Sequence, residues 1–308
     1  MDISVIIPVK NGEKYLRQCL DSVFNQSFKG DYEVIININP STDKTLEITN
    51  EYAKNYPLVV LQNKEGKTVQ QTRMIAVSKA KGKYLCFLDS DDYLDKNFLK
   101  IMFEEAEKGF DIVNCSFKTD KDGKISKNVF TKNKEMESPT ACRALLKDTY
   151  IRSFQCTKII KRELYDKHIP VVKKQGVLFE DALAVYYAFI KAKKVKSISK
   201  ALYIYRSHSS SQTKQVNPNR FINHLQAFCY IRYLIDNQKD NRYLQGFLKN
   251  IFRMKLSLWY DGHISRKVLG YGGFKALKKH KNILKELKTK GKFNYTKFPE
   301  IEGYIESF

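Results

Sequence analysis

Several common sequence signatures are missing from this chain of 308 residues. No apolar run approaches the roughly 18 residues needed to cross a bilayer, so we expect no transmembrane helix. The first 15 residues lack a basic segment and a small-residue cleavage site, which argues against a signal peptide and favours a cytoplasmic protein. No Gly-x-Gly-x-x-Gly follows the first predicted strand and no P-loop motif occurs, which disfavours dinucleotide-binding and P-loop chemistry.

Cysteines are few and scattered. The six are not arranged in Cys-x-x-Cys pairs, so the spacing typical of zinc sites is absent. Each lies in or beside an apolar segment, and thiols in the cytoplasm stay reduced. We therefore expect all six to be free and buried, as small apolar side chains are: Cys19, Cys86, Cys115, Cys142, Cys156 and Cys229.

Acidic residues are also scarce, because 33 Asp and Glu face 55 Lys and Arg, a formal net charge of +22. Half of the excess lies in residues 217–308, with 18 basic and 7 acidic residues (18 − 7 = 11). Eight lysines and one acid fall between Lys275 and Lys292, beside apolar residues at helical spacing. Such a helix lies on an anionic membrane or docks its apolar stripe on the body of the protein, and the two interpretations are compatible. The stripe consists of Phe274, Leu277, Ile283, Leu284 and Leu287.

The first 120 residues alternate between strand and helix patterns. Continuous apolar runs indicate strands buried on both faces, and apolar residues three or four apart indicate helices between them. Strands joined by single helices form βαβ units, so we predict an α/β fold with a mainly parallel central sheet. The expected strands are 3–9, 33–38, 58–61, 83–88 and 111–117, and the expected helices are 15–24, about 44–56, 69–81 and 97–108.

The remainder is mixed and then helical. Asp122-Gly123 predicts a hairpin turn. Beyond about residue 217 the chain is expected to be helical throughout, with core helices around 228–235 and 251–259. Between these regions we expect helices at about 139–147, 161–167 and 181–193 and a short strand at 203–205.

An acidic tetrad, Asp89-Ser90-Asp91-Asp92, follows a predicted strand. Ligands of open α/β sheets bind beyond the carboxyl ends of the strands, which places the tetrad near residues 8–10 and 37–39. Three carboxylates so close together repel one another unless a cation or hydrogen-bond donors neutralise them. Mg²⁺ and Mn²⁺ prefer oxygen ligands and share them with phosphates. The tetrad therefore indicates either a metal–phosphate site or an Asp cluster that caps the next helix.

Several segments together carry a family resemblance. They are SVIIPVKNGEKYL at 4–16, SVFNQSF at 22–28, STDKT at 41–45 and YLCFLDSDD at 84–92, followed by residues 157–162, 179–181 and 205–208. In this order they resemble the family 2 glycosyltransferases of the GT-A fold. The resemblance covers residues 1–214 and implies a catalytic domain with a nucleotide-sugar half at about 1–118 and an acceptor half at about 119–214. Residues 215–308 would form a separate basic helical subdomain.

The resemblance implies an inverting transfer of a sugar from a nucleotide-diphosphate donor to an acceptor hydroxyl, with Mn²⁺ or Mg²⁺ as cofactor. Asp91 would coordinate the metal, His208 would be a metal or phosphate ligand, and Asp92 is a weaker candidate that could instead cap the next helix. Asp181 would be the general base, with Glu180 the next candidate. The donor would contact Pro8, Val9, Asn39, Arg73, Asp89, Ser90 and Arg206.

The role of Asp181 also has a plainer explanation. It stands at the start of a predicted apolar helix, where a carboxylate is stabilised by the helix dipole whatever its function. Only the resemblance favours a general base, which would take the proton from the acceptor hydroxyl.

One position departs from the family pattern. Where the family usually has two aspartates, the second of which recognises uracil, this chain has Ile38 and Asn39. The amide oxygen of Asn39 can still accept a hydrogen bond from a uracil N–H, but the amide carries no charge and can also donate. A UDP-hexose or UDP-N-acetylhexosamine is the expected donor, with dTDP-, GDP- and CMP-sugars as alternatives.

The implied acceptor is a bacterial surface glycan, a teichoic acid or a lipid-linked oligosaccharide, met at the inner face of the plasma membrane through the basic tail. Two other functions stay open. The charge, with 19 Tyr and 19 Phe, suggests a nucleic-acid-binding protein, although no such motif occurs and the acidic tetrad opposes a polyanion. Ile38-Asn39 suggests a degenerate scaffold that binds nucleotide sugars without turnover.

Overall fold

The computed structural model describes residues 1–126, 132–148, 150–172, 179–208, 217–264 and 272–306. Within them ten strands form one sheet: β1 Ile3–Val9, β2 Tyr32–Ile38, β3 Leu58–Gln62, β4 Tyr84–Phe87, β5 Tyr93–Leu94, β6 Ile112–Lys121, β7 Lys124–Ile125, β8 Lys134–Glu137, β9 Lys158–Lys161 and β10 Lys194–Arg206. The order is β3-β2-β1-β4-β9-β6-β10-β5, with β7 beside β6 and β8 beside β10. Strands β3, β2, β1 and β4 are parallel, as are β6 and β10. The predicted α/β fold with a mostly parallel central sheet is confirmed.

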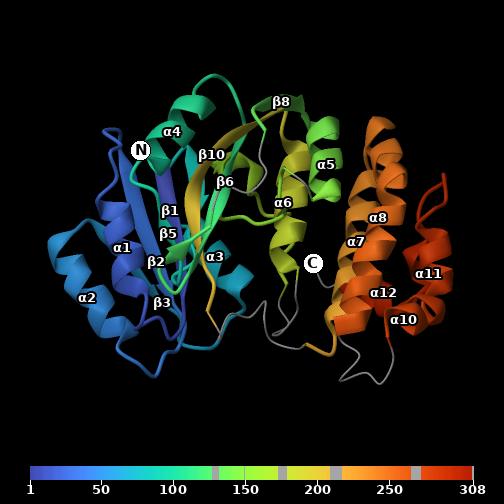
Figure 1. Ribbon diagram of the computed structural model, residues 1–308, viewed down its shortest axis with the longest axis horizontal. Helices are drawn as coiled ribbons and strands as arrows, with labels where there is room; N and C mark the ends of the chain where they lie inside the picture. Colours follow the sequence, from blue (N-terminus) through green and yellow to red (C-terminus); the bar gives the residue numbers. More distant parts are fainter. Residues whose placement is uncertain (127–131, 149, 173–178, 209–216, 265–271, 307–308) are drawn as a thin grey trace.

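Helices cover both faces of the sheet (Figure 1). Alternate side chains of β1 point to opposite sides, so Ile3, Val5 and Ile7 join one hydrophobic cluster and Ile6 joins the other. The first cluster packs under α1 Leu16–Phe24, α2 Thr45–Asn55 and α4 Phe98–Ala106. The second packs under α3 Val69–Val77, α5 Ser138–Lys147 and α6 Glu180–Lys191. All six cysteines are free and buried, as expected.

The middle of the chain contains the largest departures from the sequence-based expectations. The helix expected at 161–167 is wrong: β9 ends at Lys161 and a 3-10 turn follows at Arg162–Leu164. Ile159 and Ile160 bury their side chains on opposite faces of the sheet, which a strand allows and a helix does not. The short strand expected at 203–205 is the end of the much longer β10. The hairpin at Asp122-Gly123 is confirmed, with positive φ at both turn residues.

The described C-terminal residues are helical, as predicted. They form α7 Arg220–Asp236, α8 Arg242–Ile264, α10 Gly273–Lys279, α11 Lys281–Glu286 and α12 Pro299–Ile305, with a 3-10 turn at Tyr295–Lys297. Leu225 and Phe247 of these helices belong to the same buried cluster as Phe189 of α6. The helical part therefore continues the hydrophobic core of the sheet-containing part.

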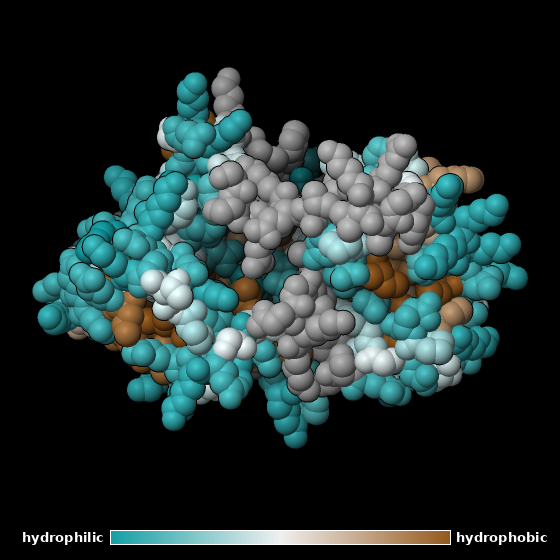
Figure 2. Space-filling view, turned by 90° about the horizontal axis from the view of Figure 1, so that it is seen from below, coloured by the Kyte–Doolittle hydropathy of each residue, from teal (hydrophilic) through white to brown (hydrophobic). Residues whose placement is uncertain are grey.

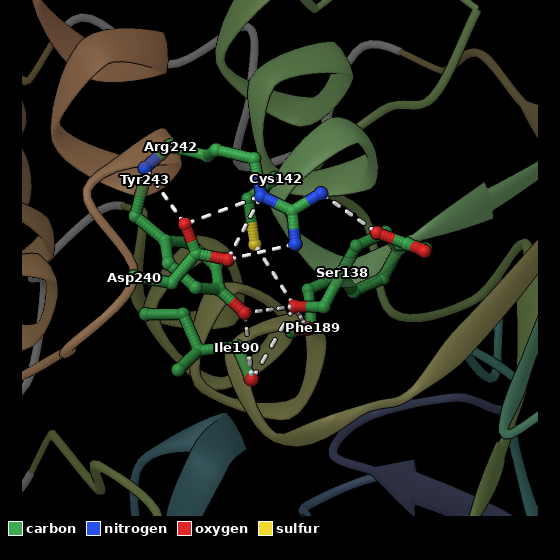
Figure 3. Close-up of polar contacts among 8 residues, drawn as sticks. Ser138, Cys142, Phe189, Ile190, Asp240, Arg242 and Tyr243 are labelled. Atoms are coloured by element: carbon green, nitrogen blue, oxygen red, sulfur yellow. Dashed lines mark hydrogen bonds and ion pairs between the residues drawn. The ribbon is translucent and has the colours of Figure 1, made fainter.

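A polar junction fixes α8 to α5 and α6 (Figure 3). Ser138 Oγ donates to the carbonyl oxygen of Phe189 at 2.5 Å and shares a hydrogen bond with Tyr243 Oη at 2.6 Å. At the surface beside it, Arg242 pairs with Asp240 and with Glu137. The buried bonds hold the start of α8 in one position against α5 and α6.

The apolar stripe between residues 274 and 287 docks on the body of the protein through most of its length. Ile283, Leu284 and Leu287 are buried, whereas Phe274 is exposed. The core helix expected at 251–259 is correct for Met254 and Leu258 but wrong for its outer face, which stays exposed. Among the described helices, none is both long and apolar enough to cross a membrane.

The guanidinium of Arg232 is fully buried in the C-terminal helices. Its nitrogens donate to Asp236 and to the carbonyl oxygens of Leu287, Thr289 and Gly291. Arg232→Ala would leave a buried carboxylate and three carbonyls without their donor, and should lower the free energy of unfolding by about 3–5 kcal/mol. Urea denaturation measures this loss, with exposed Arg253→Ala as control. A loss below about 1 kcal/mol for Arg232→Ala would contradict the role.

Candidate active site

The loop after β1 is held by the turn at 41–45. Asp43 accepts hydrogen bonds from the amide of Glu13 at 2.9 Å and from Thr45 Oγ1 at 2.5 Å. Thr45 Oγ1 in turn accepts from the amide of Gly12 at 2.7 Å. A Cβ on Gly12 would lie 2.6 Å from Val9 Cγ2, so the close approach requires glycine here. These hydrogen bonds fix the loop that follows Pro8 and Val9 at the carboxyl end of β1.

The acidic tetrad lies at the carboxyl end of β4, and its aspartates have different partners. Asp89 pairs with Arg73 Nη2 of α3 at 2.6 Å. Asp92 is buried, accepting from Tyr203 Oη at 2.5 Å and from the amide of Arg206 at 2.7 Å. Asp92 thus ties the tetrad to the end of β10, a role that neither the metal nor the helix-capping alternative anticipated.

Asp91 and His208 face each other. His208 Nε2 lies 2.8 Å from Asp91 Oδ2, and the His208 ring packs beside the Tyr15 ring with 5.1 Å between centroids. Burial, followed by the charge of Asp89, raises the pKa of Asp91, and His208 opposes the shift. Within the described ranges, no three His, Cys, Asp or Glu side chains gather into a metal cluster. The convergent oxygen and nitrogen donors of Asp91 and His208 nevertheless fit a divalent cation shared with phosphate oxygens.

The guanidinium of Arg206 forms hydrogen bonds and ring contacts within the protein. Its Nε donates to the carbonyl oxygen of Asp91 at 2.8 Å and its Nη2 to Gln18 Oε1 at 2.6 Å. The guanidinium also lies over the rings of Tyr15 and Tyr93. Arg206 thereby supports the tetrad, and its expected contact with phosphate stays a prediction.

The side-chain amide of Asn39 is likewise occupied. Its Oδ1 accepts from Asn63 Nδ2 at 2.9 Å and from the amide of Lys67 at 3.2 Å, and its Nδ2 donates to the carbonyl oxygen of Lys67 at 2.9 Å. Asn39 therefore anchors the loop after β3 to the carboxyl end of β2. Its expected bond to a donor base also stays a prediction.

Two half-buried carboxylates, Glu180 and Asp181, begin α6. Burial raises the pKa of Asp181, Arg73 opposes the shift and Asp89 adds to it. Burial and then Asp181 raise the pKa of Glu180 to about 7. The preceding residue, Phe179, has φ of 69°, a left-handed conformation that a bulky side chain rarely adopts and that is often found at functional sites. Glu180 is thus suited to exchanging protons near neutral pH, and the raised pKa of Asp181 makes its carboxylate a stronger proton acceptor than an exposed aspartate.

Arg73 connects the two acidic groups. Its side chain is almost fully buried, which alone would lower its pKa, but the carboxylates of Asp89, Asp181 and Glu180 outweigh burial and raise it. A buried arginine among these carboxylates keeps a positive charge at the centre of the site.

A single cleft of about 1980 Å³ contains these groups. It opens at the carboxyl ends of β1, β2 and β4, the side from which Figure 2 is seen. Arg206 is the one predicted site residue that does not line it. Those that do are Pro8, Val9, Asn39, Arg73, Asp89, Ser90, Asp91, Asp181 and His208.

The far wall of the cleft comes from α7 and α8 and was not predicted. Asp261 accepts from Arg220 Nε at 2.6 Å and pairs with His224, whose ring stacks on Phe179 at 4.1 Å. Sequence carried no signal for it, because Phe179, the Arg220–His224 pair and Asp261 are at least 37 positions from one another and follow no motif. Lys158 was also missed: it is fully buried, donates to the carbonyl oxygens of Arg152 and Phe154, and burial lowers its pKa to about 8.

Comparison with known proteins identifies the class. Residues 4–169 match the family described as glycosyl transferase family 2, and the chain belongs to this family. The chain is 27% identical over 221 residues to the glycosyltransferase EpsJ of Bacillus subtilis, covering 69% of this chain and 63% of EpsJ. It is 30% identical over 234 residues to the poly(ribitol-phosphate) beta-N-acetylglucosaminyltransferase TarS of Staphylococcus aureus, covering 72% of this chain and 39% of TarS. The chain thus spans less than two thirds of the length of either relative.

Solved structures show the same fold. The structure of S. aureus TarS residues 1–349 with UDP-GlcNAc has a TM-score of 0.68 and 22% identity, covering 100% of this chain and 80% of that one. The mannosyltransferase PcManGT from Pyrobaculum calidifontis with GDP-Man and Mn²⁺ has a TM-score of 0.57 and 14% identity, covering 99% and 85%. The identification as a family 2 glycosyltransferase with the corresponding fold is confirmed.

The raised pKa of Glu180 has a consequence for stability. Below about pH 4.5 Glu180 is neutral in the folded and unfolded states, and above about pH 7 it is ionised in both, so the folded state bears the cost of the buried charge only at high pH. Glu180→Gln should therefore raise the free energy of unfolding at pH 8 by roughly 1–2 kcal/mol and leave it unchanged at pH 4. Urea denaturation at both pH values checks this, with exposed Glu104→Gln as control. An equal effect at both pH values would contradict the assignment.

Proposed function

We propose that this family 2 glycosyltransferase moves a sugar, with inversion, from a nucleotide-diphosphate donor to a hydroxyl group of a bacterial surface glycan or lipid-linked acceptor. The observation that carries the proposal is one cleft that holds both a ligand pair for a metal, Asp91 and His208, and a carboxylate suited to act as base, Asp181. A single displacement needs these groups on opposite sides of the reacting carbon and no enzyme nucleophile.

The donor end is the rim formed by β1, β2 and β4. Val9 and Pro8 would contact the base through the backbone, Asp89 would lie near the ribose, and Arg73 would offset charge near the nucleotide. A uridine donor is favoured because UDP-GlcNAc is bound in the TarS structure, although the PcManGT structure holds GDP-Man. Because the Asn39 amide oxygen already accepts two hydrogen bonds from the loop after β3, base recognition would have to use its Nδ2 group or the backbone.

A divalent cation, Mn²⁺ or Mg²⁺, would be held by Asp91 and His208. When bound, the ion offsets the negative charge that develops on the departing nucleoside diphosphate. Asp89, Asp91 and Asp92 already carry more negative charge than Arg73 can balance, which favours a cation here.

Asp181 would act as the general base. Because burial raises its pKa, the carboxylate is a stronger proton acceptor than an exposed aspartate. The position of Asp181 is rigid because the residue lies at the start of α6. The next residues of that helix, Leu183 and Ala184, are fully buried. In this arrangement the acceptor hydroxyl loses its proton to Asp181 as its oxygen attacks the sugar.

The acceptor would enter between the sheet and the C-terminal helices. That wall offers Arg220, His224 and Arg253, which suit an acceptor with phosphate groups. The polymer named for TarS, poly(ribitol-phosphate), belongs to this chemical class. We assign residues 1–118 to the donor, 119–214 to the acceptor and 215–308 to the outer wall, and place the enzyme in the cytoplasm at the inner face of the membrane.

Replacing the base tests the proposal directly. Asp181→Asn should leave binding of UDP-GlcNAc near normal and reduce transfer to poly(ribitol phosphate) by about 100- to 10,000-fold, the usual contribution of a general base. Release of UDP is the measurement, and Glu180→Gln is the matched variant. If Asp181→Asn keeps full activity while Glu180→Gln loses it, Glu180 is the base instead. If the unmodified chain releases no UDP with this or any other glycan acceptor, the chain is a scaffold.

Replacing the metal ligand tests the cofactor and the donor base together. In calorimetry, Mn²⁺ should tighten UDP binding to the unmodified chain, and UDP should bind better than GDP. In Asp91→Ala the gain from Mn²⁺ should fall by more than about tenfold because one of two protein ligands is lost. Exposed Glu104→Ala is the control. If Mn²⁺ tightens UDP binding to Asp91→Ala as much as to the unmodified chain, the metal assignment is refuted. If the unmodified chain binds nucleic acid and no nucleotide, a non-enzymatic nucleic-acid-binding protein is favoured.

A further inference from the structure

One face of α8 exposes large apolar side chains. Phe252, Leu256, Trp259 and Tyr260 are 78%, 55%, 40% and 57% exposed, and Phe274 at the start of α10 is 75% exposed. We call these five residues the α8 face. They account for nearly half of the eleven large apolar side chains that are exposed in the described part of the chain. Figure 2 shows apolar surface gathered over the C-terminal helices, at the right of the view.

Helical geometry explains why the face is continuous. Residues at spacings of four, seven and eight lie on the same side of a helix, so 252, 256, 259 and 260 form one stripe. The opposite side of α8 is fully used in packing, with Phe247, Met254 and Leu258 buried. The exposed stripe is therefore surplus to what the fold needs for stability.

Positive charge surrounds this stripe. Between Arg242 and Lys281 the sequence has ten Lys and Arg and a single acid, Asp261, which is buried and paired with Arg220 and His224. Lys249, Arg253, Lys275, Lys278 and Lys279 are exposed around the face. Lys255 lies against Lys288, and this contact is the main reason that the pKa of Lys255 is lowered. Arg242 pairs with Asp240 and Glu137, but within the described residues none of the five exposed cations around the face forms an ion pair with an acid.

The face is continuous with the cleft. Leu256 and Tyr260 line the cleft, as does Arg253, which precedes Leu256 by three positions on the same helix. Whatever covers the α8 face therefore lies at the mouth of the candidate active site.

We propose that the α8 face binds the surface of an anionic lipid bilayer and so presents the cleft to a lipid-linked acceptor. Aromatic side chains with a polar edge, such as Trp259 and Tyr260, favour the interface between hydrocarbon and headgroups. The surrounding lysines and arginines are attracted to anionic headgroups. The purpose of the contact, but not the contact itself, rests on the proposed function.

A second copy of the chain fits this face less well. In a two-fold symmetric contact both copies present the same patch, so Lys249 and Arg253 would face identical cations. The resulting repulsion opposes self-association through this face and leaves an anionic partner favoured.

Trp259 is the only tryptophan in the chain, so its emission reports on this face alone. Full-length protein is mixed with vesicles of phosphatidylcholine or of phosphatidylcholine with phosphatidylglycerol. We expect a blue shift and quenching by bromine-labelled lipid with the anionic vesicles, and weaker binding to neutral vesicles or at high salt. A blue shift that depends on protein concentration without vesicles, or no shift with either vesicle, would overturn the proposal.

Two matched double variants complete the test. Phe252→Ser with Phe274→Ser should lower the vesicle partition coefficient by about tenfold or more, because two large apolar side chains are lost. Leu46→Ser with Ile125→Ser removes exposed apolar side chains elsewhere and should leave partition unchanged. Equal partition of both variants would refute the assignment. UDP release with a soluble acceptor should be normal in both, so that failure of this proposal is distinguishable from failure of the proposed function.

Discussion

The repulsion among three carboxylates at the end of β4 is the constraint on which the site depends. The fold resolves it by giving each one a partner from a different part of the chain: Arg73 for Asp89, His208 for Asp91 and Tyr203 for Asp92. These contacts bring α3, β10 and the segment after β10 to the tetrad. Arg73 carries a full positive charge, whereas the Tyr203 hydroxyl can donate a hydrogen bond but cannot cancel charge. Negative charge is therefore left in a cleft suited to a cation.

The same contacts explain why residues of one motif have different tasks. Within the tetrad, Asp91 and Asp92 both line the cleft, but Asp92 is buried and accepts hydrogen bonds from Tyr203 and Arg206 of β10. In the segment after β10, His208 faces Asp91 while Arg206 is fixed between Gln18 and two tyrosine rings. Residues of one short segment therefore differ in their hydrogen-bond partners and in their burial.

Sequence predicted the fold of the first 120 residues well because their strands are continuous apolar runs and their helices are amphipathic. It failed at β9, where four residues, Lys-Ile-Ile-Lys, are too few to distinguish strand from helix without their neighbours. It also failed on the outer side of α8, because periodicity reports which residues are apolar and not whether anything covers them. Nine of the ten predicted site residues line the cleft, since the motif order itself specifies which strand ends meet. The wall formed by Arg220, His224 and Asp261 depends on packing of distant helices and had no local signal.

The junction at Ser138 and the shared core limit how far the C-terminal helices of this protein can be changed. Within the described residues, Asp181 bonds to the amide of Ala182 on its own helix, so its position is set by where α6 lies. One side of α6 packs toward the sheet, and the other contacts α5 and α7. The C-terminal helices therefore support α6 from the side opposite the sheet. Exchanging them for another module would also displace Asp181, so under the proposed function a change of acceptor and the alignment of the base would have to change together.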